Sequence, residues 1–327
     1  MRIGIFTEGG GDVGLGHVSR CTAFYDVLDS KQIETQLMVM SDVSITSIIE
    51  DRKARVFPAA TPIEAMIDQL TNFDAIILDR ITITQTEIDL LLQQPFKLLV
   101  IDDYNRYQYK DTIIVDWTVG VENTELHAHN RNDNILLLGV EYAALRRPFW
   151  VVSQRDPNAG CILITMGGAD VRDLSPSITQ AVRNHYATNL IRLVIGPAFQ
   201  KKNVESLRKI KNISIIEHPD AERMLDAMLD ADLVITAGGQ TLYELNAVQR
   251  SAIAIEVADN QREDIAAWNA AGLVQDWLVW DDTELCEKLL ISTDKYFGRI
   301  HETGPPQKEP INNNGVEKVI DILLRQI

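Results

Sequence analysis

The chain has 327 residues, 46% of them hydrophobic and 24% charged, with a formal net charge of −16 and a pI near 4.8. Its length allows two domains with separate cores, and its composition is that of a soluble globular protein. The acidic balance, with no basic run to neutralise phosphates, argues against a nucleic-acid partner. A nucleotide ligand remains compatible with it, because such a ligand needs only local hydrogen-bond donors.

The three cysteines, Cys21, Cys161 and Cys286, are odd in number and widely spaced. They support neither a disulfide framework nor a zinc site, and the histidines lack metal-ligand spacing. We therefore expect no metal and no other cofactor. No apolar run approaches the roughly 18 residues of a membrane span, and no signal-type segment stands at the N-terminus. We expect a cytoplasmic protein without stable membrane insertion; these features carry no prediction of an oligomeric state.

The N-terminal stretch predicts a strand, a glycine-rich loop and a helix. Residues 2–6 are apolar, glycines crowd the next ten positions, and a helical pattern opens near His17. A helix N-terminus behind such a loop offers backbone N–H groups and a positive dipole end to an anion. The run Gly9–Gly14 also fits the dinucleotide fingerprint, but adjacent glycines make a chance match easy and no clear acidic ribose partner follows. The alternative is a tight turn before a helix.

The first half of the chain continues as alternating strands and helices. The pattern predicts strands over 35–40, 73–78, 97–101, 113–117 and 135–139, and helices over 18–28, 41–49, 63–70 and 84–93. Two buried strands are followed by acidic residues, at Asp79 and at Asp102–Asp103. This is typical of the carboxyl ends of a parallel sheet, where open α/β folds bind their ligands.

A second α/β half begins after a change of pattern at Pro148–Ala159, which we interpret as the interdomain link. The pattern predicts strands over 161–166, 190–195, 213–217, 233–236 and 252–256, and helices over 174–184, 204–210, 221–231, 242–249 and 261–271. Regular alternation with short loops is typical of α/β units. After a break at Gly304–Pro310, a last helix is predicted over 316–327. We expect domains at 1–150 and 151–310, and a C-terminal helix within 311–327 that packs on the first domain.

Two more glycine loops, Gly167-Gly168 and Gly238-Gly239, each follow a predicted strand and precede a helix. Three such loops over two halves indicate two sheets whose loops meet across a cleft, with a diphosphate cradle in the second half. After the third loop, Thr241 stands at a helix start and Glu244 lies one turn further on. The same spacing is that of a capping box, which is the structural alternative.

Three further positions have purely structural interpretations as well. The pair Asn260-Gln261 opens a helix and could be a simple N-cap. His218 follows a strand and would by itself be assigned to a turn. Arg20 lies one turn into the first helix, where it either reaches the cleft or is solvated.

Six segments in chain order carry a family pattern. They are 14–21, 101–104, 142–149, 164–170, 218–245 and 259–261. Together they resemble the pseudaminic-acid-pathway UDP-sugar hydrolases and the related spore-coat polysaccharide proteins. The resemblance covers nearly the whole chain, and its specificity comes from the agreement of several motifs.

The resemblance implies a GT-B-like fold of two facing Rossmann-like domains with parallel sheets and an interdomain cleft, as in the N-acetylglucosaminyltransferase of peptidoglycan synthesis. It implies a UDP-sugar partner, from which water releases UDP with inversion at the anomeric carbon of a diacetamido-trideoxy sugar. His17 would be the catalytic histidine that positions or deprotonates the water. Glu244 would bind the ribose, the second-half glycine loops the diphosphate, and Asn260-Gln261 would face the sugar. The implied substrate and nucleotide contacts are Gly14, Gly16, Arg20, Gly167, Gly168, Asp170, His218, Gly238, Gly239, Gln240, Thr241, Glu244, Asn260 and Gln261.

The sequence Asp79-Arg80-Ile81 departs from the family pattern, which places an aspartate, a polar or histidine residue and a tyrosine after this strand. The missing aromatic residue leaves room for another sugar and for an acceptor other than water. The alternatives are therefore a glycosyltransferase that uses a lipid or saccharide acceptor, and a nucleotide-sugar sensor without catalysis. The presence of His17 argues against the sensor.

Overall fold

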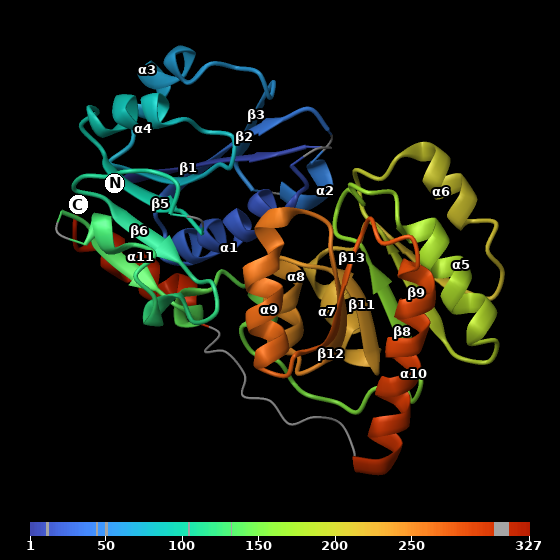
Figure 1. Ribbon diagram of the computed structural model, residues 1–327. Coiled ribbons are helices and arrows are strands. Elements are labelled where there is room, and N and C mark those ends of the chain that lie inside the picture. Colours follow the sequence, from blue (N-terminus) through green and yellow to red (C-terminus); the bar gives the residue numbers. More distant parts are fainter. Residues whose placement is uncertain (11–12, 44, 50–51, 104, 132, 304–313) are drawn as a thin grey trace. The chain divides into compact units, whose positions relative to one another are not determined.

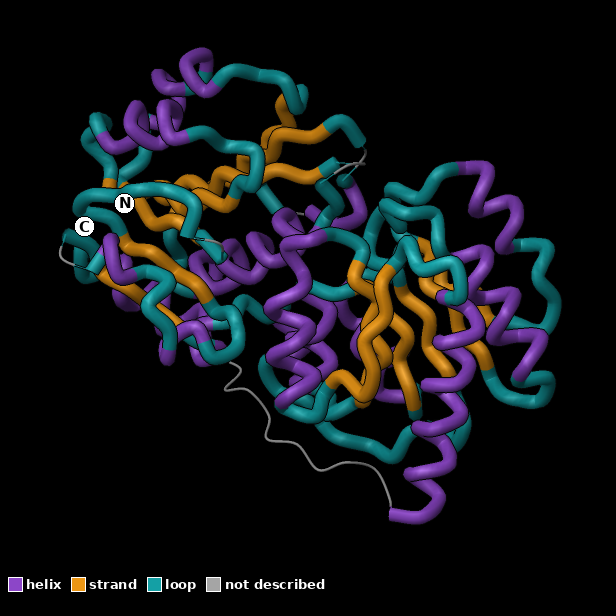
Figure 2. The backbone as a smooth tube through the Cα atoms, viewed as in Figure 1, coloured by secondary structure: helices purple, strands orange, loops and turns teal. Residues whose placement is uncertain are grey.

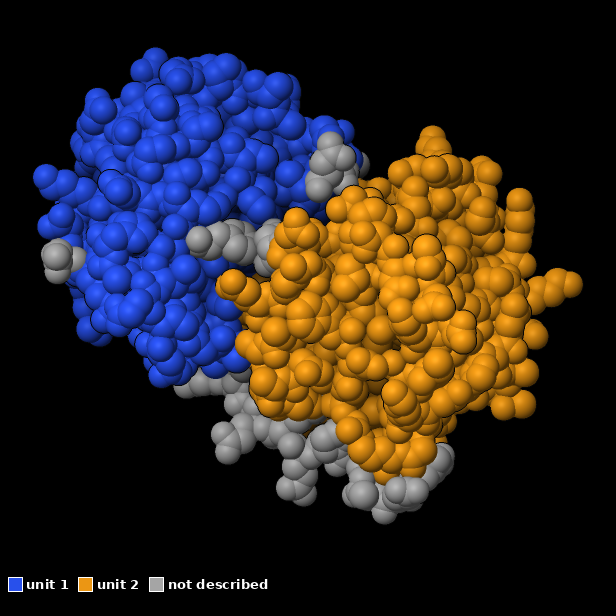
Figure 3. Space-filling model, in the orientation of Figure 1, with its two compact units in different colours: residues 1–147, 312–327 blue, residues 148–311 orange. Residues whose placement is uncertain are grey.

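The computed structural model describes residues 1–10, 13–43, 45–49, 52–103, 105–131, 133–303 and 314–327. The chain divides into two compact units (Figure 3): unit 1 contains residues 1–147 and the C-terminal segment from 312, and unit 2 contains residues 148–311. Each unit has its own cluster of buried apolar side chains. Each is built on one parallel sheet with helices against its faces (Figures 1 and 2).

Unit 1 contains a seven-stranded sheet of order β3-β2-β1-β4-β5-β6-β7, in which every pairing is parallel. The strands are β1 (Arg2–Gly9), β2 (Glu34–Ser41), β3 (Ala54–Phe57), β4 (Ala75–Asp79), β5 (Lys97–Ile101), β6 (Ile113–Asp116) and β7 (Ile135–Leu138). The inner strands are nearly continuous apolar runs because helices cover both faces of the sheet. The strand order reverses between β1 and β4, which makes their carboxyl ends the topological switch point.

The helices of unit 1 include the C-terminal one. They are α1 (Gly16–Ser30), α2 (Thr46–Ile49), α3 (Ile67–Leu70), α4 (Gln85–Leu92) and α11 (Gly315–Leu324), with 3-10 turns at Ile63–Ala65, Val121–Asn123, Ala128–Asn130 and Val140–Tyr142. Helix α11 packs on α1 and on the turn at Val140–Tyr142. A Cβ on Gly315 would lie 2.7 Å from the Ala143 carbonyl oxygen, so only glycine allows this close approach.

Unit 2 contains a six-stranded sheet of order β10-β9-β8-β11-β12-β13, again parallel throughout. The strands are β8 (Ile162–Thr165), β9 (Ile191–Ile195), β10 (Ser214–Glu217), β11 (Leu233–Ala237), β12 (Ser251–Glu256) and β13 (Val274–Val279). The helices are α5 (Ser175–His185), α6 (Lys201–Leu207), α7 (Ala221–Asp230), α8 (Gln240–Ala247), α9 (Arg262–Ala270) and α10 (Leu285–Thr303). The strand order here reverses between β8 and β11, which gives unit 2 its own switch point.

The structure differs from the sequence-based elements at a few places. The helix predicted over 41–49 is only Thr46–Ile49, since Ser41 ends β2, and the helix over 63–70 is split into a 3-10 turn and α3. Strands β3 and β13 and helix α10 were not predicted. Both strands lie at sheet edges, where partial exposure dilutes the apolar pattern that reveals a strand. The break expected at Gly304–Pro310 lies outside the described residues.

Candidate active site

The carboxyl edge of the first sheet brings His17 and Asp79 together. His17 is the second residue of α1, which follows β1, and Asp79 is the last residue of β4. Strands β1 and β4 are neighbours. The His17 Nδ1 atom lies 2.8 Å from Asp79 Oδ1, and the two side chains are 14% and 1% exposed. The switch point of unit 1 therefore carries a buried carboxylate–imidazole pair.

Arg20 binds the same carboxylate from one turn further along α1. Its Nε donates to Asp79 Oδ2 and its Nη2 to Asp79 Oδ1, each at 2.6 Å, and its Nη1 donates to Asp103 Oδ2 at 2.6 Å. Its guanidinium carbon also lies 5.0 Å from the centre of the Trp117 ring. Arg20 is buried, so the solvated interpretation of this residue is wrong.

These contacts set the charge of Asp79. Burial alone would raise the pKa of this carboxyl group, but the charge of Arg20 and the interaction with His17 outweigh burial and hold the pKa well below its usual range. Asp79 is therefore ionised at neutral pH and can only accept hydrogen bonds.

An ionised Asp79 fixes the tautomer of His17. The hydrogen-bond network assigns the proton to Nδ1, which donates it to the carboxylate, and leaves a lone pair on Nε2. Arg20 Nη2 lies 3.2 Å from Nδ1, but both atoms then carry hydrogens and this approach is not a hydrogen bond. Nε2 makes no hydrogen bond with any described residue. The imidazole is thus prepared to take a proton at Nε2.

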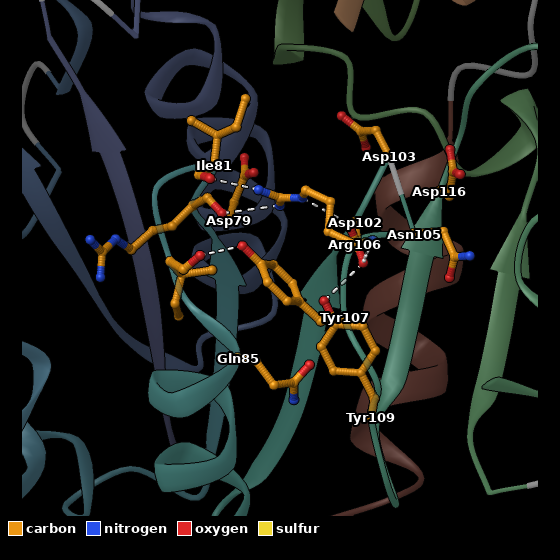
Figure 4. Close-up of polar contacts among 12 residues, drawn as sticks. Asp79, Ile81, Gln85, Asp102, Asp103, Asn105, Arg106, Tyr107, Tyr109 and Asp116 are labelled. Carbon is orange, nitrogen blue, oxygen red and sulfur yellow. Dashed lines mark hydrogen bonds and ion pairs between the residues drawn. The ribbon is translucent and has the colours of Figure 1, made fainter. Parts of the chain in front are cut away.

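Further carboxylates stand at the ends of the next strands (Figure 4). Asp103 has its pKa raised by burial, against the lowering effect of Arg20, and by the nearby charges of Asp116 and Asp79. Asp116 Oδ2 lies 2.8 Å from His127 Nε2 in a fully buried pair. Asp79 and Asp103 thus both place negative charge against Arg20, which stabilises its cationic form.

A second cluster holds the loops that carry these groups. Arg106 Nε donates to Asp102 Oδ1 at 3.2 Å, and Tyr109 donates its hydroxyl hydrogen to Asp102 Oδ2 at 2.9 Å (Figure 4). Arg106 Nη1 donates to the Ile81 carbonyl at 2.7 Å. The segment after β5 is thereby fastened to the segment after Asp79.

The Asp79-Arg80-Ile81 segment, which departs from the family pattern, is held by buried contacts with β1. Arg80 is 5% exposed, its Nε donates to Glu8 Oε2 at 3.1 Å, and its guanidinium carbon lies 5.1 Å from the centre of the Phe6 ring. Glu8 Oε1 accepts hydrogen bonds from the backbone N–H groups of Ile81 and Thr82 at 2.5 and 2.7 Å. These residues fix the backbone that follows Asp79.

The first glycine loop closes on itself. Gly10 and Gly14 exchange backbone hydrogen bonds of 3.0 and 2.8 Å, so these N–H groups are already used. Gly14 has a φ of +80°, and Gly16 begins α1 as an exposed residue. The fingerprint Gly9–Gly14 includes positions 11 and 12, which lie outside the described residues.

In unit 2, the loops with Gly167-Gly168 and Gly238-Gly239 follow the neighbouring strands β8 and β11, at the switch point. Gly239 has a φ of +102° and is the N-cap of α8, which starts at Gln240 without a side-chain cap. The capping-box interpretation of Thr241 and Glu244 is therefore wrong. Thr241 is half-buried and Glu244 is buried, both in the first turns of this helix.

Gln261 contacts one of these glycine loops and the segment after β12. Its Oε1 accepts a hydrogen bond from the Val257 backbone N–H at 3.0 Å, and its Nε2 donates to the Gly238 carbonyl at 3.2 Å. The segment after β12 is thus tied to the glycine loop after β11. Asn260 lies in the 3-10 turn Asp259–Gln261, and its side chain is outside the described part of the structure.

Asp170 and His218 occupy different surroundings. Asp170 is buried, and its two carboxylate oxygens accept the backbone N–H groups of Leu174 and Ser175 at 2.9 Å each, where α5 begins. His218 is exposed with a φ of +43° and follows β10, which β9 and β8 separate from β11. The structure brings the glycine loops and Gln261 together and leaves His218 apart from them.

Sequence reasoning missed Asp79 and Asp103 as site residues. The signal was present, because both follow buried strands that end in acidic residues. Nothing local, however, shows that one of these carboxylates meets His17 across the β1–β4 pairing.

The replacement of Gly196 by alanine should destabilise unit 2. A Cβ at Gly196 would clash with the backbone carbonyl group of Gly168, so the glycine loop would have to move. Overpacking of this kind costs about 1–3 kcal/mol, which should appear as a lower midpoint of thermal unfolding. The control is Gly298→Ala in α10, where a Cβ meets no atom within 4 Å. Equal midpoints for the two variants would contradict the close contact.

The described residues contain neither a candidate metal site nor a membrane-spanning helix. No group of three or more His, Cys, Asp or Glu side chains among them is placed to hold a metal ion. Within the same part of the chain, no helix has the length and apolar character needed to cross a membrane.

A comparison with known protein families finds no match for the chain. The chain is 26% identical over 259 residues to the uncharacterised protein MJ1062 of Methanocaldococcus jannaschii, across 75% of this chain and 53% of that protein. It is 23% identical over 252 residues to a Helicobacter pylori protein named pseudaminic acid cytidylyltransferase and UDP-2,4-diacetamido-2,4,6-trideoxy-beta-L-altropyranose hydrolase, across 76% of this chain and 43% of that one. The chain thus spans about half the length of the curated relatives that it matches.

Solved structures resemble it over nearly their whole length. UDP-GlcNAc 2-epimerase of Methanocaldococcus jannaschii, in complex with UDP-GlcNAc and UDP, matches with a TM-score of 0.64 and 13% identity, across 99% of this chain and 100% of that one. MurG of Acinetobacter baumannii matches with a TM-score of 0.57 and 13% identity over the same shares. UGT89C1 of Arabidopsis thaliana, complexed with UDP, matches with a TM-score of 0.60 and 12% identity, across 98% and 99%. The fold class predicted from the sequence is confirmed: the chain folds as two parallel-sheet α/β units of the GT-B class.

Proposed function

We propose that the protein hydrolyses a UDP-linked amino-deoxy sugar and releases UDP and the free sugar. The observation that carries this proposal is the 2.8 Å contact between His17 Nδ1 and Asp79 Oδ1, which leaves Nε2 as the proton acceptor. The Helicobacter pylori relative supports the reaction class, because its name includes a UDP-sugar hydrolase. The reaction would belong to nonulosonic acid or surface polysaccharide biosynthesis in the cytoplasm.

In the proposed reaction, a water oxygen attacks the anomeric carbon from the side opposite the nucleotide, and the water gives one proton to His17 Nε2. The bond between the anomeric carbon and the β-phosphate oxygen breaks, and UDP leaves with the electron pair. Asp79 stabilises the imidazolium that forms, and the proton then passes to solvent. The products are the inverted sugar, with a new hydroxyl group, and UDP.

Arg20 would act through Asp79 in this reaction. Its two 2.6 Å hydrogen bonds to the carboxylate keep Asp79 ionised and oriented. A carboxylate held in this way keeps the proton of His17 on Nδ1. Arg20 is therefore proposed as a positioning residue, while Gly14 and Gly16 shape the backbone in front of His17.

Unit 2 would bind the nucleotide. The loops with Gly167-Gly168 and Gly238-Gly239, followed by Gln240 and Thr241 at the start of α8, would hold the diphosphate with backbone N–H groups. Glu244 would accept hydrogen bonds from the ribose hydroxyls. Gln261 and Asp170 would hold these loops in place, since their polar atoms already bond the backbone. Asn260 would face the sugar. His218 follows β10, two strands away from β8, and would reach the nucleotide only from outside the two glycine loops.

The experiment is a screen of UDP-, CMP- and GDP-sugars without an acceptor, in water enriched in oxygen-18. We expect UDP release from an amino-deoxy sugar nucleotide. NMR spectra recorded immediately, before mutarotation, should show the released sugar with the anomeric configuration opposite to that of the substrate. The released UDP should carry no oxygen-18, because the bond that breaks joins the anomeric carbon to the β-phosphate oxygen and the water oxygen enters the sugar. Label in UDP would contradict attack at the anomeric carbon.

The same screen separates the alternative. UDP release that requires an added saccharide or lipid acceptor would identify a glycosyltransferase. Conversion of one UDP-sugar into its epimer without UDP release would exclude both reactions.

A further inference from the structure

Arg172 is fixed at the carboxyl edge of the second sheet by contacts from two other strands. It stands four residues after Gly168, in the segment that follows β8. Its Nε donates to the carbonyl oxygen of Val257, just after β12, at 2.8 Å. Its guanidinium carbon lies 4.1 Å from the centre of the Trp280 ring, just after β13. Because β11 lies between β8 and β12, the side chain reaches past the carboxyl end of β11.

The rest of the guanidinium remains open. Nη1 and Nη2 of Arg172 make no hydrogen bond or ion pair with any described residue, and the residue is exposed. Other arginines of unit 2 differ in this respect: Arg192 pairs with Asp230, Arg208 with Glu217 and Arg262 with Glu256. Arg172 therefore presents an uncompensated positive charge in a fixed position.

We propose that Arg172 binds the diphosphate of the nucleotide ligand through Nη1 and Nη2. This inference rests on the proposed function and adds a phosphate contact to it. A guanidinium offers two parallel N–H donors that match phosphate oxygens, and the Trp280 ring and the Val257 carbonyl hold its plane before any ligand arrives. Less side-chain freedom is then lost on binding. In a chain with a net charge of −16, a local cation is also needed to attract an anion.

The position of Arg172 agrees with this role. It belongs to the same segment as Gly167-Gly168, and its side chain passes the end of β11, where Gly238-Gly239 begin the next loop. Backbone N–H groups of the glycine loops and the guanidinium fork would then contact one diphosphate. The backbone supplies dipoles and Arg172 supplies the full charge.

The experiment is calorimetric titration of the full chain with UDP, inorganic pyrophosphate and uridine. The variants are Arg172→Ala, Arg172→Lys and the control Arg208→Ala, whose exposed side chain pairs with Glu217 on the same unit. In Arg172→Ala we expect the affinity for UDP and for pyrophosphate to fall about tenfold to a hundredfold, as for the loss of a charge-assisted bond. The affinity for uridine should change less than about twofold. Arg172→Lys should be intermediate, since lysine keeps the charge but loses the planar fork.

The outcomes separate this inference from the proposed function. If Arg172→Ala bound UDP as tightly as the wild type does, the proposed role of Arg172 would be overturned and the proposed function would remain intact. An equal loss of UDP and uridine affinity would overturn it too, because the residue would then support the base or the fold. Binding of pyrophosphate that depends on Arg172, without any preference for UDP, would keep the anion site and count against a uridine nucleotide as substrate.

Discussion

Replacement of His17 by alanine should abolish UDP release while UDP binding is retained. A positioned general base contributes roughly 10²–10⁴-fold to a rate, and Nε2 of His17 is the proposed proton acceptor. The nucleotide contacts are proposed for unit 2, so they do not depend on this imidazole. The measurements are kcat with the substrate that the screen identifies and the dissociation constant for UDP by titration.

The matched control for this prediction is His185→Ala. His185 is an exposed histidine of unit 2 whose Nε2 lies 3.0 Å from Asp294. Its loss should leave kcat unchanged. Unchanged turnover in His17→Ala would remove His17 from the mechanism, and loss of UDP affinity in that variant would make it a nucleotide contact instead.

Replacement of Asp79 by asparagine should have the second large effect, on turnover and on stability together. Asparagine keeps the shape but loses the charge, so the proton of His17 is no longer held on Nδ1. Because Asp79 acts through His17, the loss in kcat should be no larger than in His17→Ala, up to about 10⁴-fold. The buried Arg20 also loses one of its two carboxylate partners. Breaking a buried ion pair in this way typically costs about 3–5 kcal/mol. Urea unfolding at pH 7 measures the loss of stability.

The stability effect has a defined pH dependence. The pKa of Asp79 is lowered in the folded protein, against burial, by Arg20 and His17. Its contribution is therefore complete above the unfolded pKa of about 3.9 and is lost as the pH falls through the lower folded value. The difference in unfolding free energy between wild type and Asp79→Asn should stay constant from pH 7 to about 5, and shrink below about pH 4.

The control is Asp282→Asn. The pKa of Asp282 is also lowered, by hydrogen bonds from Lys288 and the Glu284 backbone, but its side chain is 29% exposed, against 1% for Asp79. Water screens that pair, so its replacement should change the unfolding free energy far less. If Asp79→Asn unfolded at the same urea concentration as wild type at pH 7, the buried network would not stabilise the fold.

The amino-acid sequence was enough to predict most of the alternation of strands and helices in both units. Apolar runs such as 97–101 and glycine loops such as Gly238-Gly239 each span only a few residues. Because these signals are local, they can be recognised in the sequence without knowledge of the fold. The acidic residues that follow two predicted strands, at Asp79 and at Asp102–Asp103, also indicated a ligand-binding edge of a parallel sheet. His17 could be singled out because it opens a helix behind a glycine loop.

The way these features combine depends on contacts between residues that are far apart in the sequence. His17 and Asp79 are 62 positions apart, and they meet because β1 and β4 pair at the switch point. Strand order is a nonlocal property of the whole sheet. Likewise, Arg20 is buried only because Asp79, Asp103 and Trp117 converge on it from three different strand ends. Periodicity records which faces of an element are apolar, but contacts between distant side chains depend on the register and order of the strands that carry them.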